Sequence, residues 1–170
     1  IMLVAAMNPC PCGYYGHPTR PCTCSPQAVQ RYLSKVSGPL LDRIDLHIEV
    51  PPVEYDQLAS GQKGESSAAI RQRVNAARDI QRQRFADTGI TSNARIPTSR
   101  LRELCPLTDG AGTLLRGAFE HLGLSARAYD RLLKVARTIA DLDGSEVIDT
   151  PHIAEAVQYR SLDRKYWQTR

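Results

Sequence analysis

The chain has 170 residues, of which 42% are hydrophobic and 24% are charged. Its formal net charge is +4, a mild basic excess that weakly indicates a polyanionic partner. These values exclude wholesale disorder, and because no apolar run reaches the roughly 20 residues of a bilayer-spanning helix, we expect no integral membrane protein.

The first seven residues form an apolar run that ends at Asn8-Pro9. No basic segment precedes this run, so it does not have the pattern of a signal peptide. The run predicts a buried strand over residues 1–7. Because a chain that opens inside a strand is unusual, we expect the sequence to be part of a longer protein.

Four of the five cysteines follow this run as two pairs, Cys10 with Cys12 and Cys22 with Cys24. Nothing indicates secretion, and in a reducing compartment clustered pairs favour a metal over disulfides. Four thiolates suit a closed, structural zinc site. Two disulfides or reduced surface thiols remain alternatives, as does a site in which His17 replaces one cysteine. The fifth, Cys105, is expected to be a small buried apolar residue.

The next segment contains one predicted helix and one predicted strand. Ser25-Pro26 is a typical helix start, with serine as the N-cap and proline in the first turn, and it leads a helix over 27–36. Ser37-Gly38-Pro39 ends that helix, and a short turn or helix follows over 40–44. Residues 45–50 alternate polar and apolar side chains, which predicts a half-buried strand.

The rest of the chain is predicted to be a small helical bundle behind a linker over 59–67. Ser66 or Ser67 is the expected N-cap of its first helix, Gly123 and Gly144 are expected stops, and Thr150-Pro151 repeats the cap-and-proline start. The helices are predicted over 68–85, 97–105, 108–122, 125–142 and 150–160.

Residues 66–103 contain eight arginines and only three acidic residues. A motor that acts on nucleic acid would use such a surface to contact phosphates, and Arg71, Arg78 and Arg82 are the candidates. The alternative is a helix face that is simply solvated. The tail over 161–170 is also basic and is expected to be a frayed end.

Five runs together resemble one family. They are residues 5–13 (AAMNPCPCG), 22–25 (CTCS), 37–46 (SGPLLDRIDL), 124–129 (LSARAY) and 135–142 (VARTIADL). In this order they resemble the magnesium-chelatase-like AAA+ ATPases, nearest to the bacterial competence-associated (ComM/YifB) type.

The resemblance implies a mainly α fold with a small α/β remnant. Residues 1–58 would be the C-terminal part of an AAA+ core, with a sensor 1 strand, a four-cysteine zinc loop and a short strand. Residues 59–67 would be a linker, 68–160 an all-α lid and 161–170 a basic tail.

The resemblance also assigns roles to individual residues. Asn8 would be sensor 1, whose amide contacts the γ-phosphate or orients water, although Asn8-Pro9 alone is typical of an ordinary turn. Arg43 would be an arginine finger, the alternative being a surface ion pair with Asp42 or Asp45.

Arg127 would be sensor 2, with Arg131 one turn further as the fallback. A cation in the first helical turn is disfavoured by about 0.3–1 kcal/mol, which is itself a reason to look for an anionic ligand there.

The sequence lacks a Gly-x-x-x-x-Gly-Lys-[Ser/Thr] motif and an apolar strand ending in Asp-Glu, which in this family hold ATP and Mg²⁺. We expect these parts to lie N-terminal to Ile1, in a full-length cytoplasmic bacterial ATPase that forms a homohexamer and remodels DNA as a helicase in competence. The alternatives are a chelatase motor for porphyrin metallation and a non-enzymatic zinc module that binds nucleic acid.

Overall fold

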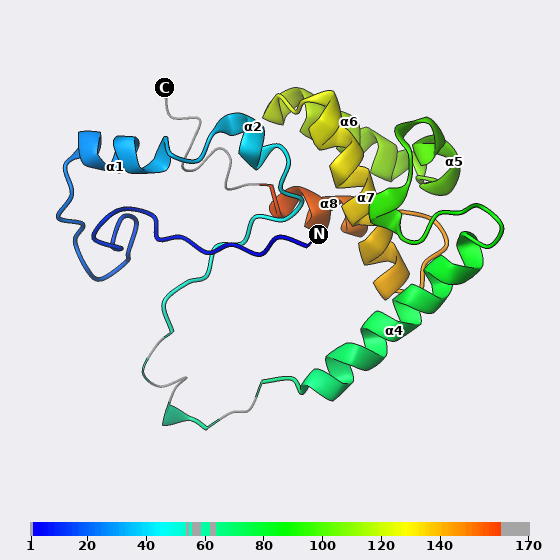
Figure 1. Cartoon of the computed structure of the whole chain (residues 1–170), viewed down its shortest axis with the longest axis horizontal. Helices are drawn as coiled ribbons and strands as arrows, with labels where there is room; N and C mark the ends of the chain where they lie inside the picture. The colour runs from blue at the N-terminus through cyan, green and yellow to red at the C-terminus, as the bar shows by residue number, and fades with distance from the viewer. Residues whose placement is uncertain (1, 54, 56–58, 62–63, 161–170) are drawn as a thin grey trace.

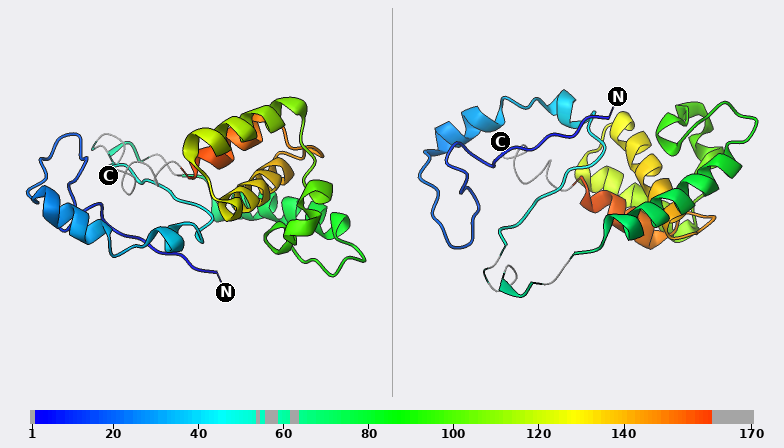
Figure 2. Two further views of the ribbon diagram at one scale, coloured as in Figure 1. Left: turned by 90° about the horizontal axis from the view of Figure 1, so that it is seen from above. Right: turned by 60° about the horizontal axis from the view of Figure 1, so that its bottom comes forward.

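The computed structural model describes residues 2–53, 55, 59–61 and 64–160. The N-terminal part is mostly irregular chain with two short helices, α1 (Pro26–Leu33) and α2 (Gly38–Leu41), and the C-terminal part is a helical bundle (Figure 1). In both views of Figure 2 the loop that precedes α1 lies at the opposite end of the molecule from the bundle. The basic tail predicted over 161–170 lies outside the described residues.

The bundle contains one long helix that leads into it and three that form its centre. These are α4 (Ser67–Arg84), α6 (Asp109–Leu122), α7 (Ala126–Leu142) and α8 (Thr150–Gln158). Between α4 and α6 the chain makes two single 3-10 turns, η1 (Asn93–Arg95) and η2 (Thr98–Arg100), and the short helix α5 (Leu101–Leu104).

Most helix starts follow from local capping. The side chains of Ser25, Ser66 and Ser125 each accept a hydrogen bond from an amide three residues further on, which satisfies one of the open donors of the first turn. Gly123 ends α6 in the left-handed conformation, as predicted. The predicted start of α8 is wrong by one residue, because Asp149 is the N-cap and forms a capping box with His152.

The core of the bundle lies around α7. Its fully buried residues Leu132, Ala136 and Ala140 pack with Leu115 of α6 and Ile153 of α8. Cys105 is buried in the same cluster, as the sequence predicted. Since α7 packs against α4, α5 and α8, it is the element through which the rest of the bundle is held together.

The two predicted strands are not formed. Residues 2–7 and 45–50 are extended but belong to no ladder, and the side chains of Met2 and Val50 are 89% and 83% exposed. Within the described ranges the only β-type pairing is the isolated bridge between Leu107 and Ile148. An extended segment becomes a strand only when a neighbouring segment pairs with its amides and carbonyls in a ladder. The His47 amide donates to the Tyr159 carbonyl (2.8 Å), but this bond belongs to no ladder among the described residues.

The prediction of a mainly α protein is thus confirmed, and the prediction of an α/β remnant is wrong for this structure. None of the described helices is both long and apolar enough to cross a bilayer.

Along α4 the apolar side chains are buried only toward its C-terminal end. Ala77 and Phe85, at its C-terminal end, are 4% exposed, whereas Ile70 and Val74 are 43% and 46% exposed. The first half of α4 therefore extends past the core of the bundle, as Figure 1 shows.

Candidate metal centre and anion-facing arginines

The four clustered cysteines converge in the loop before α1. The Sγ atoms of Cys10 and Cys12 are 3.3 Å apart, and Cys22 Sγ lies 3.7 Å from the first and 3.5 Å from the second. Cys24 Sγ completes the group, and the four Sγ atoms all lie within 4.8 Å of one another. The loop therefore brings two separate Cys-x-Cys pairs to one point.

The loop takes this shape for local reasons. Gly13 and Gly16 have φ angles of +84° and +80°, which residues with a side chain rarely adopt. The Gly13 amide donates to the Cys10 carbonyl (3.0 Å), which closes a tight turn around the first pair. Val29 and Leu33 of α1 pack against the buried Cys10, so the helix forms a base for the cluster.

The spacing of the thiols fits zinc. Four sulfurs at about 2.3 Å around a tetrahedral ion are about 3.8 Å from one another, whereas a disulfide needs about 2.05 Å. The three separations among Cys10, Cys12 and Cys22, 3.3–3.7 Å, are near the first value, and all four residues are free cysteines. Within the described part of the chain, the residues grouped at metal-binding distance are these four cysteines without His17.

The protonation of the thiols also favours a cation. Amide hydrogen bonds from Tyr14 and Thr23 lower the pKa of Cys12 to about 5, so this thiol ionises readily. At Cys22 the Cys24 amide acts in the same direction, but desolvation and the neighbouring thiols raise the pKa to about 12. Without a metal the four thiols cannot all be ionised at neutral pH, and a divalent cation would remove that conflict.

We predict about one zinc ion per chain in protein purified without chelator. Cys10→Ser and Cys22→Ser should each lose most of the zinc, because each removes one of four ligands. Cys105→Ser is the matched control and should keep the full content, since Cys105 is buried in the bundle core instead. Elemental analysis measures this, and a well-folded chain without zinc would contradict the prediction.

Asn8 lies at the entrance of the cysteine loop, two residues before Cys10. Its side chain is exposed, and an added Cβ at Gly13 would lie 3.9 Å from its Cγ. The buried strand that should carry it is absent, so Asn8 is positioned by the loop and not by a sheet. Its role as sensor 1 stays a prediction.

Arg43 lies in the exposed turn that follows α2. Its Nη1 donates to the Pro39 carbonyl (2.7 Å), and no described carboxylate forms an ion pair with it. The alternative weighed from the sequence, an ion pair with Asp42 or Asp45, is therefore not formed.

Both of these carboxylates are occupied by the helical part of the chain. Asp42 accepts a hydrogen bond from Ser125 Oγ (3.0 Å) and forms an ion pair with Arg160 (3.6 Å). Asp45 forms an ion pair with Arg131. The turn that carries Arg43 is thus attached to α7 through both of its acidic neighbours.

Arg127 lies in the first turn of α7, two residues from the Ser125 contact. Its side chain is exposed, and among the described residues its guanidinium has no hydrogen-bond or ion-pair partner. Arg131, the fallback candidate, differs in this respect, because it is 28% exposed and paired with Asp45. Arg43 and Arg127, both exposed, therefore lie in the two segments that the contact between Asp42 and Ser125 joins, one and two residues from it in the sequence.

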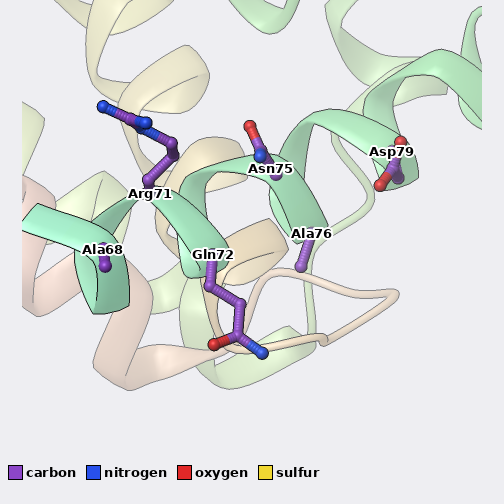
Figure 3. A pocket seen from close by; sticks show the side chains of 6 residues that line it. All are labelled: Ala68, Arg71, Gln72, Asn75, Ala76 and Asp79. Carbon is purple, nitrogen blue, oxygen red and sulfur yellow. The ribbon is translucent and has the colours of Figure 1, made fainter.

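The arginines of α4 are less available than their number suggests. Arg71 lines a shallow depression with Gln72, Asn75 and other residues of the same helix, so this is an open surface (Figure 3). Arg82 is paired with Asp79, and Arg78 donates to the Gln81 side chain (3.4 Å).

Sequence reasoning missed a buried polar network between α4 and α7. Asp141 accepts hydrogen bonds from Arg137 (3.1 Å), Arg84 (3.0 Å) and Asn93 (2.7 Å). The side chains of Arg137 and Asp141 have no exposed surface. Arg84, which the sequence analysis counted in the basic surface, is therefore a structural residue, and the i,i+4 spacing of Arg137 and Asp141 was the available signal.

Comparison with known families accounts for almost the whole chain. Residues 64–160 match the family described as magnesium chelatase, subunit ChlI C-terminal, and residues 1–58 match the one described as magnesium chelatase, subunit ChlI.

Individual relatives extend over nearly the same length. The chain is 47% identical over 164 residues to an uncharacterized protein YifB of Escherichia coli and 46% identical to the competence protein ComM of Haemophilus influenzae, 95% of this chain in each case. It is 38% identical over 160 residues, 93% of its length, to an uncharacterized protein of Mycobacterium tuberculosis. It spans 31% of the length of each of these relatives.

Proposed function

This chain belongs to the magnesium chelatase subunit ChlI family, and from that membership we propose that it is the C-terminal portion of a magnesium-chelatase-like AAA+ ATPase. The longer protein, called the full-length protein below, would hold ATP and Mg²⁺ with residues outside this chain and would assemble as a hexamer in the bacterial cytoplasm. This chain would contribute Asn8 as sensor 1, Arg43 as the arginine finger and Arg127 as sensor 2.

The observation that supports this proposal is that Arg43 and Arg127 are both exposed in the segments that the hydrogen bond between Asp42 and Ser125 joins. The nearby carboxylates of Asp42 and Asp45 are held by Ser125, Arg160 and Arg131. Arg43 and Arg127 are left exposed and without an acidic partner among the described residues, so an external anion can reach them. A triphosphate is such an anion, and a planar guanidinium suits its oxygens better than an ammonium does.

We propose further that ATP hydrolysis is coupled to work on DNA, because one relative is named a competence protein. The exposed first half of α4, with Arg71, and the exposed Arg78 further along the helix would then form a surface for phosphate contacts. The name of the family favours a second candidate, a motor subunit for inserting magnesium into a porphyrin. Stimulation of ATP hydrolysis by DNA would separate the two, since a chelatase motor has no reason to respond to it.

The proposal predicts that this chain is necessary for ATP hydrolysis but does not hydrolyse ATP by itself. The 170-residue chain alone should show no ATP hydrolysis above a buffer blank, because it lacks the phosphate-binding motif. In the full-length protein, Arg127→Ala should lower turnover about 10²- to 10³-fold, the usual effect of removing one donor from a transition-state charge. Phosphate release measures both.

Arg116→Ala is the matched control, because Arg116 is an exposed arginine on the neighbouring helix α6. This variant should hydrolyse ATP at the unmodified rate. Turnover by the isolated chain would contradict the proposal that ATP is held by residues outside this chain. Unchanged turnover in Arg127→Ala, or an equal loss in both variants, would contradict the assignment of Arg127.

A further inference from the structure

The outer end of the cysteine loop is an ordered aromatic and cationic surface that the proposed function does not use. We define the knuckle surface as Tyr14, Tyr15, His17 and Arg20. The Arg20 guanidinium lies over the Tyr14 ring, with Cζ 5.4 Å from the ring centroid, and its Nη1 donates to the Tyr14 hydroxyl (2.9 Å). The His17 ring meets Tyr14 edge-on at 5.6 Å.

These contacts hold the side chains of Tyr14, His17 and Arg20 in place before any ligand binds. The His17 Nδ1 accepts hydrogen bonds from the amides of Thr19 (3.2 Å) and Arg20 (3.1 Å), which fixes the backbone that carries the arginine. One donor of Arg20 is used by Tyr14, and the side chain is otherwise exposed, so several N–H groups stay available. A preorganised cation loses less entropy on binding than a free one.

The segment of chain that carries the knuckle surface has charged residues of one sign. Residues 1–41 contain no aspartate or glutamate, and their charged side chains are Arg20, Arg31 and Lys35. Lys35 Nζ lies 5.9 Å from the Tyr32 ring centroid, so a second pair of a cation and an aromatic ring is present at the C-terminal end of α1. A four-thiolate zinc centre would carry a charge of −2, and the loop with α1 would remain net positive.

We propose that the knuckle surface binds single-stranded nucleic acid, which deepens the proposed action on DNA by naming a surface for it. Bases would stack on Tyr15, which is 43% exposed, and on the outer face of the Arg20 guanidinium. Arg20, Arg31 and Lys35 would contact the phosphates. A single strand fits better than a duplex, because stacking on a side chain needs a base face that pairing and stacking in a duplex conceal.

The test is binding of a fluorescent oligothymidine of about 20 nucleotides to the zinc-loaded chain without nucleotide, followed by anisotropy. We expect Tyr15→Ala and Arg20→Ala to weaken binding about 5- to 100-fold, and Tyr15→Phe to bind nearly as the unmodified chain does. The affinity of the unmodified chain should fall steeply as salt rises. Elemental analysis of each variant establishes that the zinc loop is retained.

The matched controls are Tyr55→Ala and Arg102→Ala, which change the same residue types at exposed positions outside the loop. Both should bind as the unmodified chain does. An oligouridine of the same length distinguishes RNA from DNA as the source of the single strand.

Four results would overturn the proposal: no binding by the unmodified chain at low salt, equal affinity for duplex DNA, equal competition by polyglutamate, or a loss on Arg71→Ala in α4 but not on Arg20→Ala. Because the assay contains no ATP, such a result would leave the assignments of Arg43 and Arg127 intact. Likewise, an unchanged ATP turnover in the Arg43 and Arg127 variants would not contradict the proposal for the knuckle surface.

Discussion

Replacing Arg43 by alanine in the full-length protein is expected to lower ATP hydrolysis about 10³- to 10⁵-fold while ATP binding stays unchanged. The side chain is exposed and its acidic neighbours are engaged elsewhere. Among the described residues its guanidinium donates to the Pro39 carbonyl and pairs with no carboxylate. As the proposed arginine finger, Arg43 would contact a phosphate held by another subunit. It would act on the charge that develops during phosphoryl transfer, so its loss would affect turnover and not affinity.

Two measurements make this prediction specific. Phosphate release gives turnover, and binding of a fluorescent ATP analogue gives affinity. Arg43→Lys keeps the charge but loses the planar fork, so it should recover only a small part of the activity. Arg116→Ala again serves as the exposed arginine control. Unchanged turnover in Arg43→Ala would rule out the arginine finger.

Mixing two inactive variants would show whether Arg43 acts between subunits. Asn8 is proposed to act within its own subunit, so a mixed ring of Asn8→Ala and Arg43→Ala subunits contains some intact sites. Random assembly in a head-to-tail ring would make about a quarter of the sites intact. Recovery of about a quarter of the activity is expected. No recovery would mean that Arg43, like Asn8, acts on the nucleotide bound by its own subunit.

The second large effect concerns stability. Asp141→Ala is expected to lower the free energy of unfolding by about 3–5 kcal/mol, because it leaves the buried Arg137 and the largely buried Arg84 without their shared carboxylate. Burial lowers the pKa of Arg137, so its charged form depends on the acceptors around it, which are the Asp141 carboxylate and the carbonyls of Ser145 and Glu146. Chemical denaturation followed by circular dichroism measures the change.

A control and a double variant separate the buried charge from general damage. Asp79→Ala removes a carboxylate from an exposed ion pair with Arg82 on α4 and should change the denaturation midpoint little. In the Asp141→Ala background, Arg137→Met should cost less than it does alone, since the arginine it removes is already unpaired. Additive effects of the two substitutions would contradict the role assigned to the network.

Most of what lies within a few residues could be predicted from the sequence. The caps at Ser25, Ser66 and Ser125 and the end of α6 at Gly123 follow from hydrogen bonds and dihedral angles inside one turn. The convergence of the cysteines also follows from close spacing and flexible glycines. The family could be recognised because its motifs are short and contiguous, and both family matches bear this out.

The partners of the charged groups could not be predicted in the same way. Asp141 meets Arg84 across 57 positions, Asp42 meets Ser125 across 83, and Asp45 meets Arg131 across 86. A charge count treats all these residues alike, and only the packing of α7 decides which arginines are buried and which face solvent. For the same reason Arg84 was wrongly counted in the basic surface.

The sequence by itself therefore determined the helices, the cysteine cluster and the family, because each depends on residues that are near one another in the chain. The tertiary structure alone decided that residues 2–7 and 45–50 are extended without becoming strands. It also decided that, among the described residues, Arg43 and Arg127 have no carboxylate partner while Arg131 and Arg137 do. Strand formation and ion pairing both need a partner from a distant part of the chain, and the apolar pattern or charge of a segment does not reveal whether that partner is there.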